Sequence, residues 1–202
     1  MKNCLTPCEK TVKQIEVEKS KFIGIILPFN DKNKLNDELN LIKKEYPKAR
    51  HYCYAYKVDD EFKFSDDGEP SGTAGKPILN QIEQSNLNNC LLIVVRYFGG
   101  TLLGSGRLLR TYLETAKQVI DNCRKFELIK SQKWRIFVEI ENFEQVKNYL
   151  TRNDFFIINT VFNDKICIDF VVPNEVRENI EDALFGKIEV VAKIDYLFRR
   201  DI

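Results

Sequence analysis

Histidine, tryptophan and methionine each occur only once in the 202 residues, and no two cysteines form a Cys-x-x-Cys pair. Structural zinc sites need clustered cysteine and histidine ligands, so this sequence gives such a site little support. No apolar run approaches the ~18 residues of a membrane-spanning helix. Residues 1–10 also lack the apolar centre of a secretory signal. We therefore expect a cytoplasmic protein with no metal, no cofactor and no membrane partner.

The sequence also has no excess of positive or negative charge, because 31 Lys and Arg residues balance 30 Asp and Glu residues to a net charge of +1. A protein that binds polyanions over its whole surface carries more positive charge, so any nucleic-acid contact must come from a local patch. Hydrophobic residues make up 44% of the sequence. That share is enough for the core of one large domain or of two small ones.

The most distinctive stretch is glycine-rich and basic, and it runs from Arg96 to Arg110. An apolar run precedes it and an amphipathic run follows it, which predicts a strand, a tight turn and a helix. Glycines let another group approach the main chain, and the start of a helix offers free N–H donors, so the stretch suits an anion. It lacks the Gly-Lys-Ser/Thr ending of a nucleotide-binding loop. A tight turn packed against the same domain explains it equally well.

A second unusual stretch, from Phe64 to Pro77, combines turn-forming residues with three carboxylates. Carboxylates so close together can hold a hard cation or share protons in acid–base chemistry. The alternative, which we favour, is that they form charge-assisted hydrogen bonds to nearby arginines and to loop amides. Pro77 would then open a short helix.

Hydrophobic periodicity divides the chain into two domains, over residues 1–125 and 133–202. In the first, strands are expected at 11–18, 21–29, 51–58 and 88–96, the last of them covered on both faces, with a helix after Asp31. In the second, a strand from Trp134 to Ile140 precedes a helix with a capping box at Asn142. Two strands (155–162 and 166–172), a helix capped by Asn174 and a last strand (188–198) complete a ferredoxin-like βαββαβ order.

Together these stretches resemble the YigZ/Impact family. The residues that carry the resemblance are His51–Ala55, Ser65–Gly75, Arg96–Gly100 and Leu103–Tyr112. One position departs from the common pattern, because Arg107 stands where the family usually has another glycine. The match covers about the first 125 residues, and the remainder resembles the small second domain of bacterial two-domain members.

The resemblance implies an α+β protein in two parts. The first would be a two-layer α/β domain like domain 2 of the ribosomal protein S5 group, and the second would be similar to the last domain of elongation factor G. Eukaryotic relatives regulate translation, and nucleic-acid or ribosome binding has been proposed for bacterial members. The family brings no established enzymatic activity, so we expect no catalytic residues.

The resemblance also singles out candidate residues in both stretches. For RNA or another anion, the candidates are Arg96, Tyr97, Gly99, Gly100, Gly104, Gly106, Arg107 and Arg110. For the supporting acidic loop, they are His51, Asp66, Asp67, Glu69, Ser71, Thr73 and Lys76. The arginines would contact phosphates, and Tyr97 and Phe98 could stack on an unpaired base, although packing is the more usual role of a phenylalanine.

Three functions fit these residues. The first, which we favour, is a non-enzymatic accessory or regulatory protein of translation that binds RNA or the ribosome. The second is an Mg²⁺-dependent enzyme acting on a phosphate-bearing small molecule. The third is an interaction module whose loops bind a protein of the translation apparatus. All three require the acidic and the glycine-rich loops to meet in one charged, partly open hollow.

Overall fold

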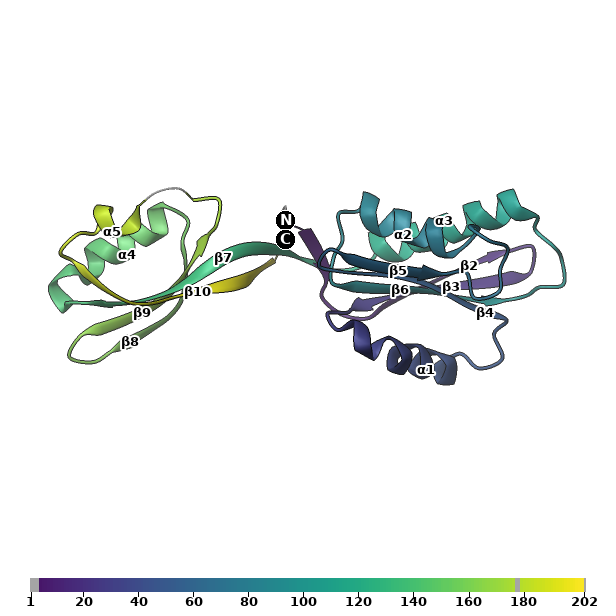
Figure 1. Cartoon of the computed structure of the whole chain (residues 1–202), viewed down its shortest axis with the longest axis horizontal. Helices are drawn as coiled ribbons and strands as arrows, with labels where there is room; N and C mark the ends of the chain where they lie inside the picture. Colours follow the sequence, from purple (N-terminus) through teal and green to yellow (C-terminus); the bar gives the residue numbers. More distant parts are fainter. Residues whose placement is uncertain (1–3, 177–178, 202) are drawn as a thin grey trace. The chain divides into compact units, whose positions relative to one another are not determined.

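The computed structural model describes residues 4–176 and 179–201. The chain forms two compact units, an N-terminal unit over residues 4–127 and a C-terminal unit over residues 128–200. Each combines helices with an antiparallel sheet, as expected for an α+β protein (Figure 1). Among the described helices, none is both long and apolar enough to cross a membrane.

The N-terminal unit is built on a five-stranded antiparallel sheet in the order β2-β3-β6-β4-β5. Its strands are β2 (Thr11–Val17), β3 (Ser20–Pro28), β4 (His51–Val58), β5 (Glu61–Ser65) and β6 (Cys90–Tyr97). A short strand, β1 (Cys4–Pro7), precedes them, and its Leu5 exchanges backbone hydrogen bonds with Asn86 and Asn88. The central strand β6 is buried from Cys90 to Arg96, which confirms the prediction that its apolar run is covered on both faces.

Helices cover both faces of this sheet (Figure 1). On one face, α2 (Gly75–Gln84) and α3 (Ser105–Asp121) pack over Leu92 and Val94. On the other face, α1 (Leu35–Glu45), preceded by the 3₁₀ turn η1 (Lys32–Lys34), packs over Leu91 and Ile93. The unit thus has one layer more than the expected two, because consecutive apolar residues of β6 point to opposite faces and each face must be covered.

The C-terminal unit has the expected βαββαβ order. Its elements are β7 (Lys125–Val138), α4 (Phe143–Arg152), β8 (Phe156–Phe162), β9 (Ile166–Pro173), α5 (Ile180–Ala183) and β10 (Ile188–Asp201), with the 3₁₀ turn η2 (Ile140–Asn142) before α4. Its sheet has the order β7-β9-β8, and both β10 and the short strand β1 pair with β7. One face of the sheet, including Ile168 and Phe170, packs against Val146 and Leu150 of α4.

Some local predictions were wrong. Strand β5 was not anticipated, and β7 begins at Lys125, well before Trp134, because edge positions and half-exposed strands tolerate charges that interrupt the apolar alternation. Asn142 forms no capping box, since its backbone is already helical in the preceding 3₁₀ turn. Helix α5 begins at Ile180 rather than after Asn174, and residues 177–178 lie outside the described part of the chain.

Candidate functional site

A pocket of about 580 Å³ lies in the N-terminal unit, where the acidic loop after β5 and the glycine-rich loop after β6 come together. The two loops reach the same place because β4 and β6 are neighbours, with His51 opposite Arg96 in the register. Its wall consists of Arg50, His51, Gly68, Glu69, Pro70, Arg96, Phe98, Leu102, Leu103, Gly104, Ser105 and Leu108. The wall therefore combines charged and polar groups with apolar side chains.

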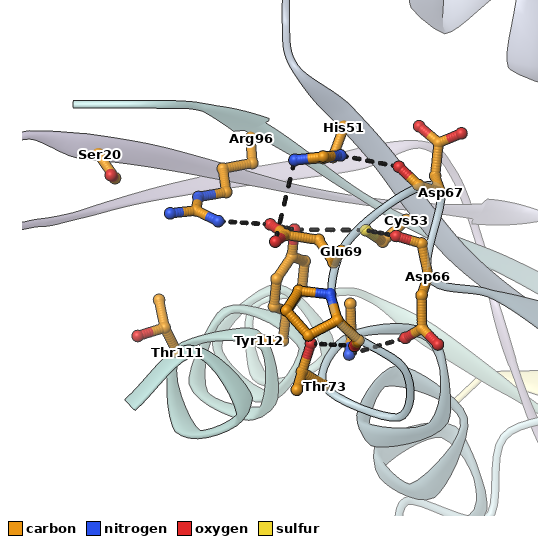
Figure 2. A network of polar contacts seen from close by, with 12 residues as sticks. Ser20, His51, Cys53, Asp66, Asp67, Glu69, Thr73, Arg96, Thr111 and Tyr112 are labelled. Carbon is orange, nitrogen blue, oxygen red and sulfur yellow. Dashed lines mark hydrogen bonds and ion pairs between the residues drawn. The ribbon is translucent and has the colours of Figure 1, made fainter. Parts of the chain in front are cut away.

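Glu69 is the centre of a buried network beside this pocket (Figure 2). Its Oε1 accepts hydrogen bonds from Nη1 of Arg96 at 2.6 Å and from the hydroxyl of Tyr112 at 2.8 Å. Glu69 and Arg96 are only 8% and 5% exposed. A buried carboxylate requires such partners, because an unpaired buried charge is strongly unfavourable. Glu69 is thus a structural counter-ion for Arg96.

The phenol of Tyr112 stays protonated in this setting. Its burial, together with the Cys53 thiol and the Glu69 carboxylate nearby, raises the pKa of Tyr112 well above its ordinary value. Burial likewise raises the pKa of the Cys53 thiol, which lies 3.3 Å from the Tyr112 hydroxyl. Both groups therefore act as neutral hydrogen-bonding groups and not as nucleophiles.

His51 connects the acidic loop to the pocket. Its Nδ1 lies 2.7 Å from the backbone carbonyl of Asp67, so Nδ1 carries a proton and donates it. Its Nε2 is 3.9 Å from Oε2 of Glu69 (Figure 2). The ring is thereby held in one orientation, with Nε2 on the Glu69 side.

Asp66 holds the acidic loop against the start of α2. Its carboxylate accepts backbone hydrogen bonds from Gly72 (2.9 Å), Ala74 (3.0 Å) and Gly75 (2.8 Å). These are N–H groups before and at the first turn of the helix, where a negative charge is favourable. Helix α2 begins at Gly75, so Pro77 stands at its third position and not, as predicted, at its first. The third position is still in the first turn, so the missing N–H of Pro77 costs no helical hydrogen bond.

The other two carboxylates of the loop also have partners within the chain. Asp67 accepts a 2.6 Å hydrogen bond from the backbone N–H of Tyr52, and Glu69 is taken up by Arg96 and Tyr112. Among the described residues, no three Asp, Glu, His or Cys side chains gather as a metal site would require. The arrangement matches the alternative in which the carboxylates bond to an arginine and to loop amides.

The glycine-rich loop leads into α3 without a side-chain cap. Gly104, just before the helix, has φ +73°, a left-handed conformation that favours glycine, and a Cβ there would meet no atom within 4 Å. The first-turn N–H groups of Ser105, Gly106 and Arg107 have no acceptor inside the helix. This helix start, open toward the pocket, offers donors and partial positive charge to an anion.

Comparison with known proteins identifies a family whose matching region includes both of these loops. The family model described as the Impact N-terminal domain matches residues 18–120, slightly more than half of the 202 residues. The chain belongs to the IMPACT family. An IMPACT family member of Haemophilus influenzae is 40% identical over 125 residues, which cover 59% of this chain and 61% of that protein. The IMPACT family member YigZ of Escherichia coli is 28% identical over 95% of this chain and 98% of its own.

A solved structure of a hypothetical protein has the same architecture over nearly the whole chain. It is 27% identical, covers 95% of this chain and 98% of its own, and has a TM-score of 0.63. The match therefore includes both the N-terminal unit with its two IMPACT-family loops and the C-terminal unit.

The basic residues of the IMPACT-family loops do not all converge. Arg96 lies in the pocket wall, whereas Arg107 forms an exposed ion pair with Glu18 at 2.7 Å. Arg110 is exposed on α3 outside the pocket wall. Tyr97 donates its hydroxyl to the backbone carbonyl of Pro47 at 3.1 Å. Arg107 and Arg110 thus belong to the outer surface of α3 and not to the hollow itself.

The remaining predicted residues either make local contacts or are exposed. Gly99 packs so closely against the β2–β3 turn that a Cβ would lie 2.1 Å from the backbone of Lys19. Thr73 donates its hydroxyl to the Pro70 carbonyl at 2.6 Å, and the Lys76 ammonium lies 5.8 Å from the ring centre of Phe64. Ser71, Gly100 and Gly106 are exposed.

Sequence reasoning missed several residues of this site, among them the polar residues Arg50, Ser105 and Tyr112. Arg50 directly precedes His51, and Ser105 is the first residue of α3, so their places in the motif could have indicated them. Tyr112 lies on the apolar stripe of α3, where a buried phenol needs a polar partner. That requirement could have suggested a link to the acidic loop.

Proposed function

We propose that the protein is a non-enzymatic accessory or regulatory protein of translation that binds RNA or the ribosome through its N-terminal unit. Membership of the IMPACT family supports the link to translation, because the resemblance identifies the eukaryotic relatives as translation regulators. The observation that carries the binding role is the pocket at the start of α3, where an uncapped helix end, a free guanidinium and an exposed aromatic ring lie together.

The positive side of the pocket is suited to phosphate. The guanidinium of Arg50 is exposed, and no carboxylate of the described residues forms an ion pair with it. Next to it, the N–H groups of the first turn of α3 supply donors without neutralising counter-charge. Contacts of this kind position a nucleic acid by its phosphates and carry no sequence information.

The ring of Phe98 supplies a surface for a base. Phe98 is 38% exposed at the pocket, and the guanidinium groups of Arg50 and Arg96 lie over its ring, 5.4 and 5.6 Å from its centre, so a base would stack on the part of the ring that they leave open. Aromatic rings beside basic groups bind unpaired bases by stacking, with little dependence on sequence. Arg107 and Arg110, on the outer surface of α3, would add electrostatic attraction for a strand that passes the pocket.

The enzymatic alternative has less support. Asp66, Asp67 and Glu69 are occupied by backbone amides, Arg96 and Tyr112, so none of the three is available to hold Mg²⁺ without breaking those bonds. The interaction-module alternative differs from RNA binding only in its partner, which would be a protein. Nuclease treatment of the bound complex distinguishes the two functions.

Anisotropy of a labelled single-stranded RNA, titrated with protein at several salt concentrations, tests the proposal. We expect Arg50→Ala and Arg110→Ala to weaken binding and to reduce the salt slope by about one each. Lys117→Ala, an exposed cation farther along α3, is the matched control. The assignment is refuted if RNA retention at low salt is the same in Arg50→Ala, Arg107→Ala, Arg110→Ala and the unmodified protein. A partner that stays bound after nuclease treatment would favour the interaction module.

A further inference from the structure

We infer that the pocket holds a single nucleotide by its terminal phosphate, that is, a nucleoside monophosphate group, rather than a continuous stretch of RNA backbone. This inference rests on the proposed function for its setting but names a narrower ligand. The same group occurs at the phosphorylated end of an RNA and in a free nucleotide.

The size and the polarity of the pocket fit one nucleotide. Its volume of about 580 Å³ is within the range of small-ligand pockets. Arg50, His51 and Arg96 supply polar groups to the wall, and Leu102, Leu103 and Leu108 supply apolar ones. A phosphate joined to a flat aromatic base likewise combines a charged group with an apolar surface.

Two independent features mark the charged end. One is the uncapped start of the long helix α3, at Gly104 and Ser105. The other is Arg96, a wall residue that is only 5% exposed and whose Nε has no hydrogen-bond partner in the described chain. Figure 2 shows one terminal nitrogen of its guanidinium at Glu69, and the unpaired Nε is the nitrogen bonded to the side-chain carbons. A buried donor without a partner is costly, so a shift of the Arg96 side chain that brought the enclosed Nε within reach of a phosphate oxygen would be favourable.

A terminal phosphate suits this charge arrangement better than an internal one. A phosphate monoester carries a charge of about −1.5 to −2 near neutral pH, whereas a backbone phosphodiester carries one negative charge. Because Glu69 neutralises Arg96, the free cation in the wall is Arg50, assisted by the helix end. Arg107 and Arg110 lie outside the wall, where they would attract the rest of an RNA whose end is in the pocket.

The test compares two short single-stranded RNAs of one sequence, labelled at the 3′ end, with a 5′-monophosphate or a 5′-hydroxyl. We expect the full-length protein to bind the phosphorylated RNA about tenfold more tightly. Unlabelled adenosine monophosphate serves as competitor. Displacement at concentrations near the Kd of the RNA identifies a free nucleotide as the ligand, and displacement only at far higher concentrations identifies the RNA end.

Ser105→Asp and Ser105→Asn are matched variants, because their side chains have the same shape and differ in charge. Aspartate at the start of a helix stabilises the helix, so the protein should remain folded, with an unchanged or higher Tm. Its carboxylate would occupy the phosphate position, so the preference for the 5′-phosphate should disappear in Ser105→Asp and persist in Ser105→Asn. Arg50→Gln, at an exposed side chain, should also reduce the preference.

The outcomes separate this inference from the proposed function. Equal binding of both RNAs overturns the inference and leaves RNA binding in place. Binding of adenosine monophosphate without binding of RNA overturns the proposed function and upholds the pocket. Absence of both overturns both. A preference for the 5′-phosphate that persists in Ser105→Asp overturns the assignment of that phosphate to the pocket and leaves RNA binding in place.

Discussion

Replacing Tyr112 by phenylalanine removes one buried hydroxyl and leaves the rest of the side chain in place. The ring packs edge-to-face on Phe22 with centroids 5.4 Å apart, and this contact does not depend on the oxygen. The lost hydroxyl donates a 2.8 Å hydrogen bond to the carboxylate of Glu69. The hydroxyl also accepts a hydrogen bond from the Cys53 thiol at 3.3 Å, but that thiol has a second acceptor in the Asp66 carbonyl at 3.0 Å. The expected effect is therefore chiefly that of one charge-assisted hydrogen bond removed from the interior of the N-terminal unit.

Hydrogen bonds to charged groups contribute about 1.5–3 kcal/mol. Tyr112 is 0% exposed and Glu69 is 8% exposed, so water cannot replace the missing donor. We expect Tyr112→Phe to lower the free energy of unfolding by about 2–3 kcal/mol, within that range. For a unit of this size, that loss corresponds to a fall in Tm of roughly 6–12 °C.

Urea denaturation followed by far-UV circular dichroism measures the loss, and hydrogen exchange assigns it to amides of α3 and β6. Tyr97→Phe is the matched control, because it removes the same atom from a hydrogen bond at an exposed site, 3.1 Å from the Pro47 carbonyl. Its effect should stay below about 0.5 kcal/mol. Equal effects of the two substitutions would show that the buried hydrogen bond to Glu69 contributes no more to stability than an exposed one.

Two further predictions concern carboxylates. Asp66→Ala should lower the free energy of unfolding by about 1–2 kcal/mol in urea denaturation, because three N–H groups at the start of α2 lose their acceptor, whereas Ser71→Ala at an exposed site should have little effect. In the C-terminal unit, Arg135 chiefly, and Lys133, lower the pKa of Asp169 against the opposing effect of burial. A lowered pKa in the folded state stabilises the protein above the unfolded pKa of about 3.9, and this contribution disappears as the pH falls through the folded pKa. Urea denaturation at pH values from 7 down into the acid range measures this effect. At pH 7, Asp169→Asn should be less stable than the unmodified protein by about 1.5–3 kcal/mol, and the difference should shrink as the pH falls. A difference that does not depend on pH would contradict this assignment.

Much of the fold could be predicted from the sequence, because it depends on local patterns. The apolar run of β6 indicated a central strand covered on both sides, and the βαββαβ order of the C-terminal unit followed from its periodicity. Predictions failed where local signals are weak. Strand β5 is an exposed edge, and Asn142 has the residue type of a helix cap but lies in a 3₁₀ turn.

The candidate site could be predicted only in part. Residue types and spacing indicated two unusual loops, one acidic and one glycine-rich, and the structure brings both to one pocket. The sequence could not separate the arginines by role. Arg96 is buried against Glu69 because β6 is central, whereas Arg107 and Arg110 lie on the exposed side of α3.

The sequence alone determined which chemical groups are available: carboxylates beside turn formers, and glycines before a helix that no side chain caps. Which carboxylate meets which cation was decided only by tertiary structure. Glu69 and Arg96 are 27 positions apart, and Tyr112 is 43 positions from Glu69. Such pairs form because the antiparallel pairing of β4 with β6 and the packing of α3 on the sheet bring distant segments together. Neither composition nor hydrophobic periodicity specifies which distant residues will meet.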